Sequence, residues 1–269
     1  MTIDALRRYL LQGLDRVLRT LVIGLAVYGG LDLARTVLAN DPSPAYLPYA
    51  ASAQEVETLE ERVAKLEALL VHVSREGDEL YVTGANLHVV NGQGRTESVN
   101  GLGNVIVGYN EDVSEGVDQT PHDRSGSHMF VAGFGNSYSG YGGMVVGRWN
   151  TASGPYSSVS GGANNVASGD RASVCGGTSN VASGEEASVS GGVGNRAAGF
   201  SSSVSGGYYN SALERWSAVS GGAGNTARAP GTSVSGGEGN TAGGQFGGMH
   251  SSVCGGSYGQ ATGSGSSVT

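Results

Sequence analysis

The sequence has little of what an ordinary globular protein uses to build a core or a catalytic cleft. Only 38% of its 269 residues are hydrophobic, which is low for an ordinary globular domain. Its five histidines stand at no mechanistic spacing from an acid or a nucleophile. We therefore expect a protein that is not an enzyme and that needs no cofactor.

Basic charge is also scarce. The formal net charge is −8, and Lys65 is the only lysine. Within residues 142–269, five arginines balance five acidic residues. Because a neutral segment offers no electrostatic footprint for phosphates, we expect no nucleic-acid partner.

Glycine, by contrast, is abundant, with 48 residues but no strict Gly-X-Y period, so a collagen helix is excluded. Instead, one 15-residue pattern recurs seven times between residues 143 and 244. An asparagine marks every copy: Asn150, Asn165, Asn180, Asn195, Asn210, Asn225 and Asn240. An apolar residue also recurs at one fixed position of every copy, here named the apolar slot: Met144, Val159, Val174, Val189, Val204, Val219 and Val234.

Each copy contains two short alternating stretches that end near glycine. Alternation points Val189 inward while Ser188 and Ser190 face outward, and it points Asn195 and Ala197 inward on the second strand. Glycines at the strand ends permit sharp corners. The pattern predicts a mostly β protein, a Gly/Ser-rich β-solenoid (β-roll) of 15-residue coils. Stacked about 4.8 Å apart, its asparagine amides would form a hydrogen-bonded ladder.

The two cysteines fit the same repeat. Cys175 and Cys254 stand in a Ser-Val-Cys-Gly-Gly context where most copies have serine, so we interpret them as outward-facing replacements. Five coil steps, about 24 Å, separate them, which is beyond disulfide reach within one chain. A bridge between identical cysteines of neighbouring chains is the alternative. No metal-ligand spacing is present.

Upstream of the repeat, apolar residues follow a heptad spacing typical of a coiled coil. The seam residues are Val56, Leu59, Val63, Leu66, Leu70 and Val73. The alternative is an amphipathic helix that packs on its own domain, but no nearby segment is rich enough to form one. The run from Arg62 to Glu67 is similar to a motif of parallel trimeric coiled coils, in which Arg and Glu pair between chains. We therefore predict three chains.

Together, the coiled coil and the repeat resemble trimeric autotransporter adhesins with haemagglutinin-like head repeats, and similar modules of phage tail fibres. The resemblance covers residues 104–269 and begins with Asn104-Val105-Ile106-Val107-Gly108-Tyr109-Asn110. It implies a homotrimer of left-handed β-rolls that adheres to cells, matrix or glycans. Two departures stand out. The family step is commonly one residue shorter, and the family's C-terminal membrane barrel has no counterpart here, so we expect any anchor at the N-terminus or in another protein.

The N-terminal segment supports three interpretations. Four arginines precede an uncharged run, residues 20–31, that is too short to span a bilayer comfortably. It fits a signal peptide cleaved after Ala39, a retained membrane anchor, or a helix that docks on a base protein. Each places the protein outside the cell, at the cell surface or on a virion.

We divide the chain into six segments. These are an N-terminal helix, signal or anchor (1–39), a Pro-containing linker (40–53), the coiled coil (54–76), a β adaptor (77–103), irregular first coils with an acidic insertion (104–141) and the regular solenoid (142–269). In the adaptor we expect strands at residues 80–83 and 87–90. The acidic insertion, residues 111–127, is either a solvated loop, which we favour, or a site for calcium or another metal ion.

Aromatic residues gather at the variable corner positions of the coils: Trp149, Tyr156, Phe200, Tyr208, Tyr209 and Trp216. They either bind a ligand or seal contacts between three β-rolls. Three function classes follow: an adhesin-like head that binds a glycan or another cell-surface receptor, a purely structural fibre, spacer or coat component, and an ice-binding solenoid. Outward serines lack the methyl group that ice-binding faces use, so we rank ice binding last.

Overall fold

A computed structural model of the chain describes residues 58–112, 122–244 and 247–269. The chain divides into two compact units, Met1–Leu87 and His88–Thr269. This division falls inside the segment 77–103 that we predicted as one adaptor. The predicted N-terminal helix or anchor (1–39), the linker (40–53) and Val56 lie outside the described residues.

The described residues of the first unit contain one short helix, α4 (Leu59–Leu69). A capping box starts it: the Thr58 hydroxyl accepts from the Glu61 N–H at 3.2 Å, and the Glu61 carboxylate accepts from the Thr58 N–H at 2.9 Å. The helix buries none of its residues, and its C-cap is Leu70. The predicted seam is therefore helical only as far as this cap.

Val73 does not continue the helix, which corrects the predicted end of the coiled coil at residue 76. It begins β1 (Val73–Glu76), which pairs antiparallel with β2 (Glu79–Val82), Val73 opposite Val82. The β-branched Val71 and Val73 favour extended backbone, and Gly77, with φ +57°, supplies the tight turn. The predicted strand at 80–83 is thus confirmed as β2, with bounds one residue earlier.

The strand predicted at residues 87–90 is wrong, because that segment forms no strand. It leads into an irregular segment, residues 88–103, that bonds to the solenoid's side chains rather than to a neighbouring strand. The Asn91 N–H donates to Nε2 of His128 at 3.2 Å, and the Asn100 N–H donates to the Ser127 hydroxyl at 2.9 Å. Residues 88–103, which we call the cap segment, therefore belong to the second unit.

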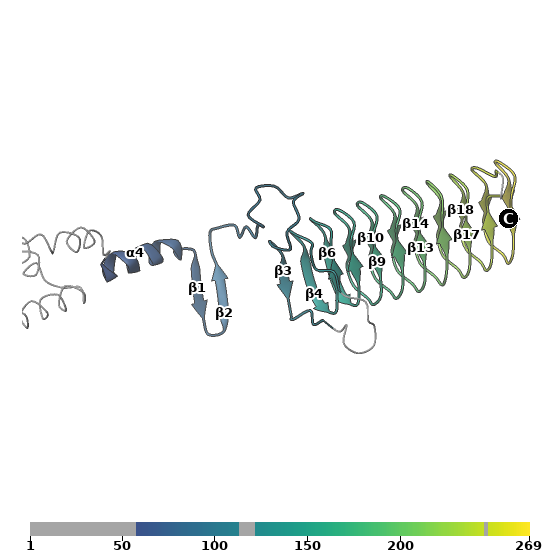
Figure 1. Ribbon diagram of the computed structural model, residues 1–269. Helices are drawn as coiled ribbons and strands as arrows, with labels where there is room; N and C mark the ends of the chain where they lie inside the picture. The colour runs from purple at the N-terminus through teal and green to yellow at the C-terminus, as the bar shows by residue number, and fades with distance from the viewer. Residues whose placement is uncertain (1–57, 113–121, 245–246) are drawn as a thin grey trace, which may run out of the picture. The chain divides into compact units, whose positions relative to one another are not determined.

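The second unit is a β-solenoid of about nine turns with coils of about 15 residues, formed by two parallel sheets (Figure 1). The 11-stranded sheet contains β3 (Val105–Val107), β4 (Phe130–Phe134), β6 (Met144–Arg148), β8 (Ser158–Val159), β10 (Ser173–Val174), β12 (Ser188–Val189), β14 (Ser203–Val204), β16 (Ala218–Val219), β18 (Ser233–Val234), β20 (Ser252–Val253) and β22 (Ser267–Val268). The nine-stranded sheet contains β5 (Ser137–Tyr138), β7 (Thr151–Ala152), β9 (Val166–Ala167), β11 (Val181–Ala182), β13 (Arg196–Ala197), β15 (Ser211–Ala212), β17 (Thr226–Ala227), β19 (Thr241–Ala242) and β21 (Gln260–Ala261).

The predicted alternation holds in the regular coils. Val189, Asn195 and Ala197 are completely buried, whereas Ser190 is exposed. Each coil also buries a position two residues before the valine, which the sequence pattern did not single out. Ser157, Ala172, Ala187, Ser202, Ser217, Thr232 and Ser251 occupy it. The core is thus a narrow stack of small side chains.

The step is not 15 residues everywhere, which corrects two predictions. Val145, not Met144, fills the apolar slot: it is fully buried and pairs with Val159, fourteen residues on. Asn150 follows Val145 by five residues, whereas Asn165 follows Val159 by six. This one added residue lengthens the step from 14 to 15 residues. Near the C-terminus, Val234 pairs with Val253, nineteen residues on.

The asparagines bond from coil to coil, but through the main chain rather than through each other's amides. Oδ1 of Asn195 accepts from the N–H of Asn210 at 2.9 Å. Its Nδ2 donates to the carbonyl of Gly191 in its own coil at 2.8 Å and to that of Gly207 in the next at 3.0 Å. The same bonds recur from Asn150 to Asn240, and Asn110 and Asn136 extend the series toward the N-terminus.

Candidate functional site

The variable side chains of the solenoid lie at two corners of each coil. We call residues 191–194 and their equivalents the glycine corner, which joins the two strands of one coil. Residues 199–202 and their equivalents form the return corner, which leads to the next coil. Trp149, Tyr208 and Tyr209 lie at glycine corners, and Tyr156, Phe200 and Trp216 lie at return corners.

Both corners hold residues in the left-handed conformation. Four of the six predicted aromatic residues have positive φ angles: Trp149 (+57°), Tyr156 (+54°), Tyr209 (+52°) and Trp216 (+57°). Their N–H groups donate to the preceding coil, for example Tyr209 to the carbonyl of Val193 and Trp216 to that of Phe200, both at 2.9 Å. Stacking thus holds bulky residues in a conformation that they rarely adopt.

Several of these rings are explained by packing within the chain. A methyl group added to Gly194 would stand 2.7 Å from Cε1 of Tyr209, and one added to Gly142 would stand 2.9 Å from Cδ1 of Tyr156. Each ring therefore lies over the corner glycine of the preceding coil. This is a third role, beside the ligand binding and the trimer contacts that the sequence suggested.

The other predicted aromatic residues make ring contacts. Tyr208 and Tyr209 meet edge to face with centroids 4.4 Å apart. Trp149 lies 6.3 Å from Phe134, and the guanidinium of Arg148 stands 4.4 Å from its ring centroid. At these distances, aromatic pairs and cation–π pairs stabilise a folded chain.

Phe200 and Trp216 form a pair at neighbouring return corners. Their centroids are 6.4 Å apart with the rings at 82°, and Arg215 lies 5.6 Å from the Trp216 centroid. The residue that precedes Trp216 by one coil is Ser201, not glycine. Trp216 thus lacks the glycine seat of Tyr156 and Tyr209, and 57% of it is exposed.

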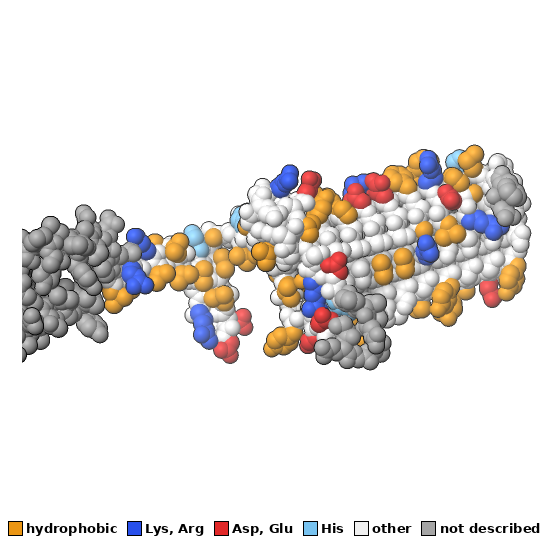
Figure 2. All heavy atoms as spheres, viewed as in Figure 1, with side chains coloured by type: hydrophobic (Ala, Val, Ile, Leu, Met, Phe, Trp, Pro, Cys, Tyr) orange, Lys and Arg blue, Asp and Glu red, His pale blue; other side chains and the backbone are white. Residues whose placement is uncertain are grey.

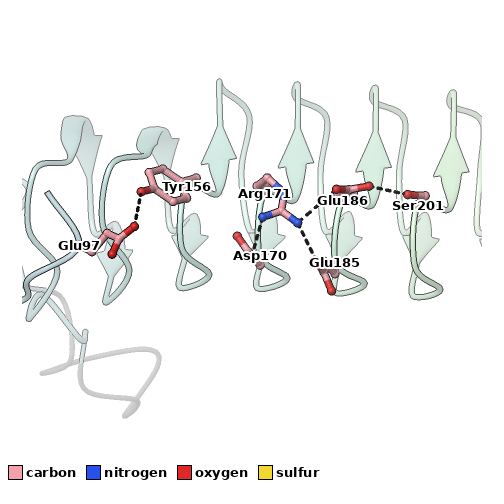
Figure 3. A network of polar contacts seen from close by, with 7 residues as sticks. All are labelled: Glu97, Tyr156, Asp170, Arg171, Glu185, Glu186 and Ser201. Atoms are coloured by element: carbon pink, nitrogen blue, oxygen red, sulfur yellow. Dashed lines mark hydrogen bonds and ion pairs between the residues drawn. The ribbon is translucent and has the colours of Figure 1, made fainter.

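A charged network that the sequence did not single out occupies the return corners before this pair (Figure 3). Arg171 binds Asp170 at 3.0 Å, Glu185 at 2.6 Å and Glu186 at 3.2 Å. The attraction of Asp170 raises the pKa of Arg171 above its ordinary value. The Ser201 hydroxyl, donating at 2.8 Å, lowers the pKa of Glu186, with a smaller contribution from Arg171. Asp170 and Glu185 are 15 residues apart, as are Arg171, Glu186 and Ser201. This spacing places them on neighbouring coils and could have revealed the network from the sequence.

Tyr156 connects the first regular coils to the cap segment. Its hydroxyl donates to the Glu97 carboxylate at 3.4 Å (Figure 3). Partial desolvation and the nearby Glu97 charge raise the pKa of this phenol. The ring also meets Tyr141 edge to face at 5.1 Å. These contacts give Tyr156 a structural role.

The acidic insertion lies partly outside the described residues, which omit 113–121. Of its described members, His122 approaches Asp112 at 3.8 Å. Among the described residues, no three His, Cys, Asp or Glu side chains gather so that they could hold a metal ion. The described helices include none with the length and apolar character needed to cross a bilayer.

Both cysteines are exposed, as the repeat predicts, and neither is bonded within its own chain. Cys175 and Cys254 follow the buried valines of β10 and β20, at the position that Ser190 occupies in its coil.

The chain matches no protein-family model. A search of curated proteins likewise finds no relative. Function must therefore be argued from the chain's own geometry.

Proposed function

We propose that this chain is a non-enzymatic trimeric fibre protein of the cell surface, extracellular space or virion, whose β-solenoid is an adhesin-like head on a coiled-coil stalk. The N-terminal segment would then engage a membrane or a base protein. The resemblance to trimeric adhesins supports the adhesive role, and the apolar seam of α4 supports the trimer.

The seam of α4 carries the proposal. Leu59, Val63, Leu66 and Leu70 are 43–70% exposed, although they follow one heptad stripe. An isolated helix shorter than about 12–15 residues is marginal in water, even with a good cap, and α4 has 11 residues and buries none. Partner helices would cover the seam, and Arg62 and Glu67 would pair between chains.

A matched pair of substitutions tests the trimer. Leu66→Lys places a charge in the seam, whereas Ala68→Lys places the same charge on the outer face of the helix. We expect native mass spectrometry to find a trimer for the unmodified chain and for Ala68→Lys, and a monomer for Leu66→Lys. If the helix stays a monomer, both sites face water and the two variants behave alike. A monomeric mass for the unmodified chain would contradict the proposed trimer.

A purely structural fibre, spacer or coat component is the second candidate. The seating of Tyr156 and Tyr209 over glycines of their own chain favours it, because those rings are then used in packing. Binding of the intact protein to cells and to extracellular matrix separates the candidates. An adhesive head binds at least one such surface, whereas a spacer binds none.

A further inference from the structure

Three arginines that have no carboxylate partner in the described part of the chain lie in three consecutive coils of the solenoid. Arg196 points outward from β13, and Arg228 follows β17 on the same outward face of the nine-stranded sheet. Arg215 lies at the return corner between them in sequence. The coils stack about 4.8 Å apart, so the three arginines span about 10 Å along the axis.

These arginines differ from Arg171, which binds three carboxylates. Arg148 and Arg215 each lie over a tryptophan ring, and the Arg228 Nε–H donates to the Gly243 carbonyl at 3.0 Å. Among the described residues, no carboxylate comes within ion-pair distance of Arg196, Arg215 or Arg228. Glu214 is the only acid in the sequence stretch 196–228, on a chain of net charge −8. The Glu186 carboxylate reaches the edge of this region, where it accepts from the Ser201 hydroxyl at 2.8 Å.

Exposed apolar side chains lie in the same coils. Phe200, Leu213 and Trp216 are 41%, 38% and 57% exposed. Leu213 follows β15 on the outward face, one coil before Arg228, and the Phe200–Trp216 pair lies at the adjoining return corners. In Figure 2 much of the solenoid surface is white, with charged and hydrophobic side chains gathered in rows.

Trp216 differs from Tyr156, which occupies the same place in its own return corner. Both residues are left-handed, as are the equivalent Arg171, Glu186, Ser201 and His250. Tyr156 lies over Gly142, but Trp216 has Ser201 at the equivalent place, and 57% of Trp216 is exposed. The exposed indole can therefore offer a ring face to a ligand.

We propose that Arg196, Phe200, Leu213, Arg215, Trp216 and Arg228, here named the arginine–tryptophan patch, bind an acidic glycan, a carbohydrate with carboxylate or sulfate groups. This names the ligand class of the proposed adhesive head and rests on that proposed function. The indole and phenyl rings offer faces for the C–H groups of sugar rings. The guanidinium groups offer planar, paired donors that match carboxylate and sulfate oxygens.

The surface favours a glycan over a protein partner. Only three apolar side chains contribute, too few for the desolvated centre of a standard interface of about 800 Å² per partner. Acidic polysaccharides repeat their charges along the chain, so they can meet arginines spread over successive coils. Weak binding at one patch would be compensated in a trimer, which presents three copies.

The repeat itself supplies substitutions that the fold accepts. Equivalent positions in other coils hold Gly for Trp216, Ser for Arg196 and Arg228, and Glu for Arg215. The test variants are therefore Trp216→Gly alone and Arg196→Ser, Arg215→Glu and Arg228→Ser together. The matched control is Arg148→Ala with Trp149→Gly, which removes another arginine–tryptophan pair and also uses residues found at equivalent corners.

Binding of the full chain is measured by biolayer interferometry on immobilised dextran sulfate and polygalacturonate, with dextran and methyl-esterified polygalacturonate as neutral counterparts. We expect binding to at least one acidic polymer and not to its neutral counterpart, weakening as salt rises. Each patch variant is expected to lose at least about tenfold in affinity, and the control less than about twofold.

Three results would overturn the proposal: equal binding to neutral polymers, equal loss in the control, or no binding to either acidic polymer. If the protein then still binds cells and the patch variants do not, the patch has a protein partner and the adhesive role stands. If it binds no cell, matrix or glycan surface at all, the adhesive role fails as well. The trimer is judged separately by its mass.

Discussion

At the scale of single residues, the solenoid depends on buried polar groups that only a stacked neighbour can satisfy. Asn195 illustrates this, because its side chain is fully buried and uses one acceptor and two donors on backbone groups of two coils. A buried backbone group without a partner costs free energy. The asparagine therefore closes the glycine corner and fixes the spacing of the next coil at once.

Replacing Asn195 by alanine should destabilise the solenoid. The substitution leaves the Asn210 N–H and the Gly191 carbonyl without a partner, while the Gly207 carbonyl keeps the Val193 N–H. We expect the free energy of unfolding to fall by about 2–4 kcal/mol. Urea unfolding followed by circular dichroism measures this. Ser190→Ala, an outward change in the same coil, is the control and should stay within about 0.5 kcal/mol. Equal stability of both variants would contradict the role given to the asparagine.

Two adjacent glycines of one corner should respond in opposite ways to alanine. Gly192 has φ +87°, and a methyl group there would stand 2.5 Å from Nδ2 of Asn195. Gly191 meets nothing within 4 Å. We expect Gly192→Ala to cost more than about 2 kcal/mol and Gly191→Ala to be neutral or to stabilise by up to about 1 kcal/mol. Thermal unfolding of the two variants, measured side by side, tests this. A large loss of stability in Gly191→Ala would show that the corner is packed differently.

Acid should weaken the Glu186 contacts. Because the folded-state pKa of Glu186 lies below its ordinary 4.5, its stabilising contribution is fully present above that pH and is lost as the pH falls through the folded-state value. Glu186→Gln should therefore melt slightly below the unmodified chain at pH 7, and the two should converge at strongly acidic pH. Glu238→Gln, an exposed change at a glycine corner, should show no such convergence. A Glu186→Gln difference that persists in acid would rule out the charged form as its source.

At the scale of elements, short pieces are stabilised by their neighbours rather than by intrinsic preference. Most strands of the solenoid have two residues and form only as rungs of a ladder. The cap segment, residues 88–103, covers the first coils through side-chain bonds to His128 and Ser127. Covering the end of a β-stack also shields unpaired strand edges, which would otherwise promote association.

Two truncations test the cap segment. A fragment 88–269 keeps it, whereas a fragment 104–269 loses the bonds of Asn91, Thr96 and Asn100 to the first coils. At about 1 kcal/mol per hydrogen bond, we expect the shorter fragment to lose roughly 2–4 kcal/mol. It should also aggregate more readily in light-scattering measurements. Identical unfolding midpoints for both fragments would show that the segment is not a cap.

At the scale of the whole molecule, the two units should differ in how they respond to concentration. The solenoid satisfies its core within one chain, whereas α4 leaves its seam exposed. If three chains associate through α4, the midpoint of the helical transition should rise with protein concentration. Circular dichroism over a hundredfold concentration range measures this. The unfolding midpoint of fragment 88–269, which lacks α4, should not depend on concentration. A concentration-independent transition of the full chain would argue against association through the helix.

The sequence by itself determined the coil. The 15-residue step, the inward Val189, Asn195 and Ala197, and the outward cysteines follow from two-residue alternation and glycine placement, which are local properties. The tertiary structure decided what depends on contacts between residues one coil or more apart. It moved the apolar slot from Met144 to Val145 and bonded the asparagines to the backbone. It also turned Val73 into a strand, because a hairpin partner lay nearby. The aromatic residues of the corners could be predicted from the sequence. Only the stacked coils show that Tyr209 lies over a glycine whereas Trp216 does not, and that Arg215 lies beside Trp216.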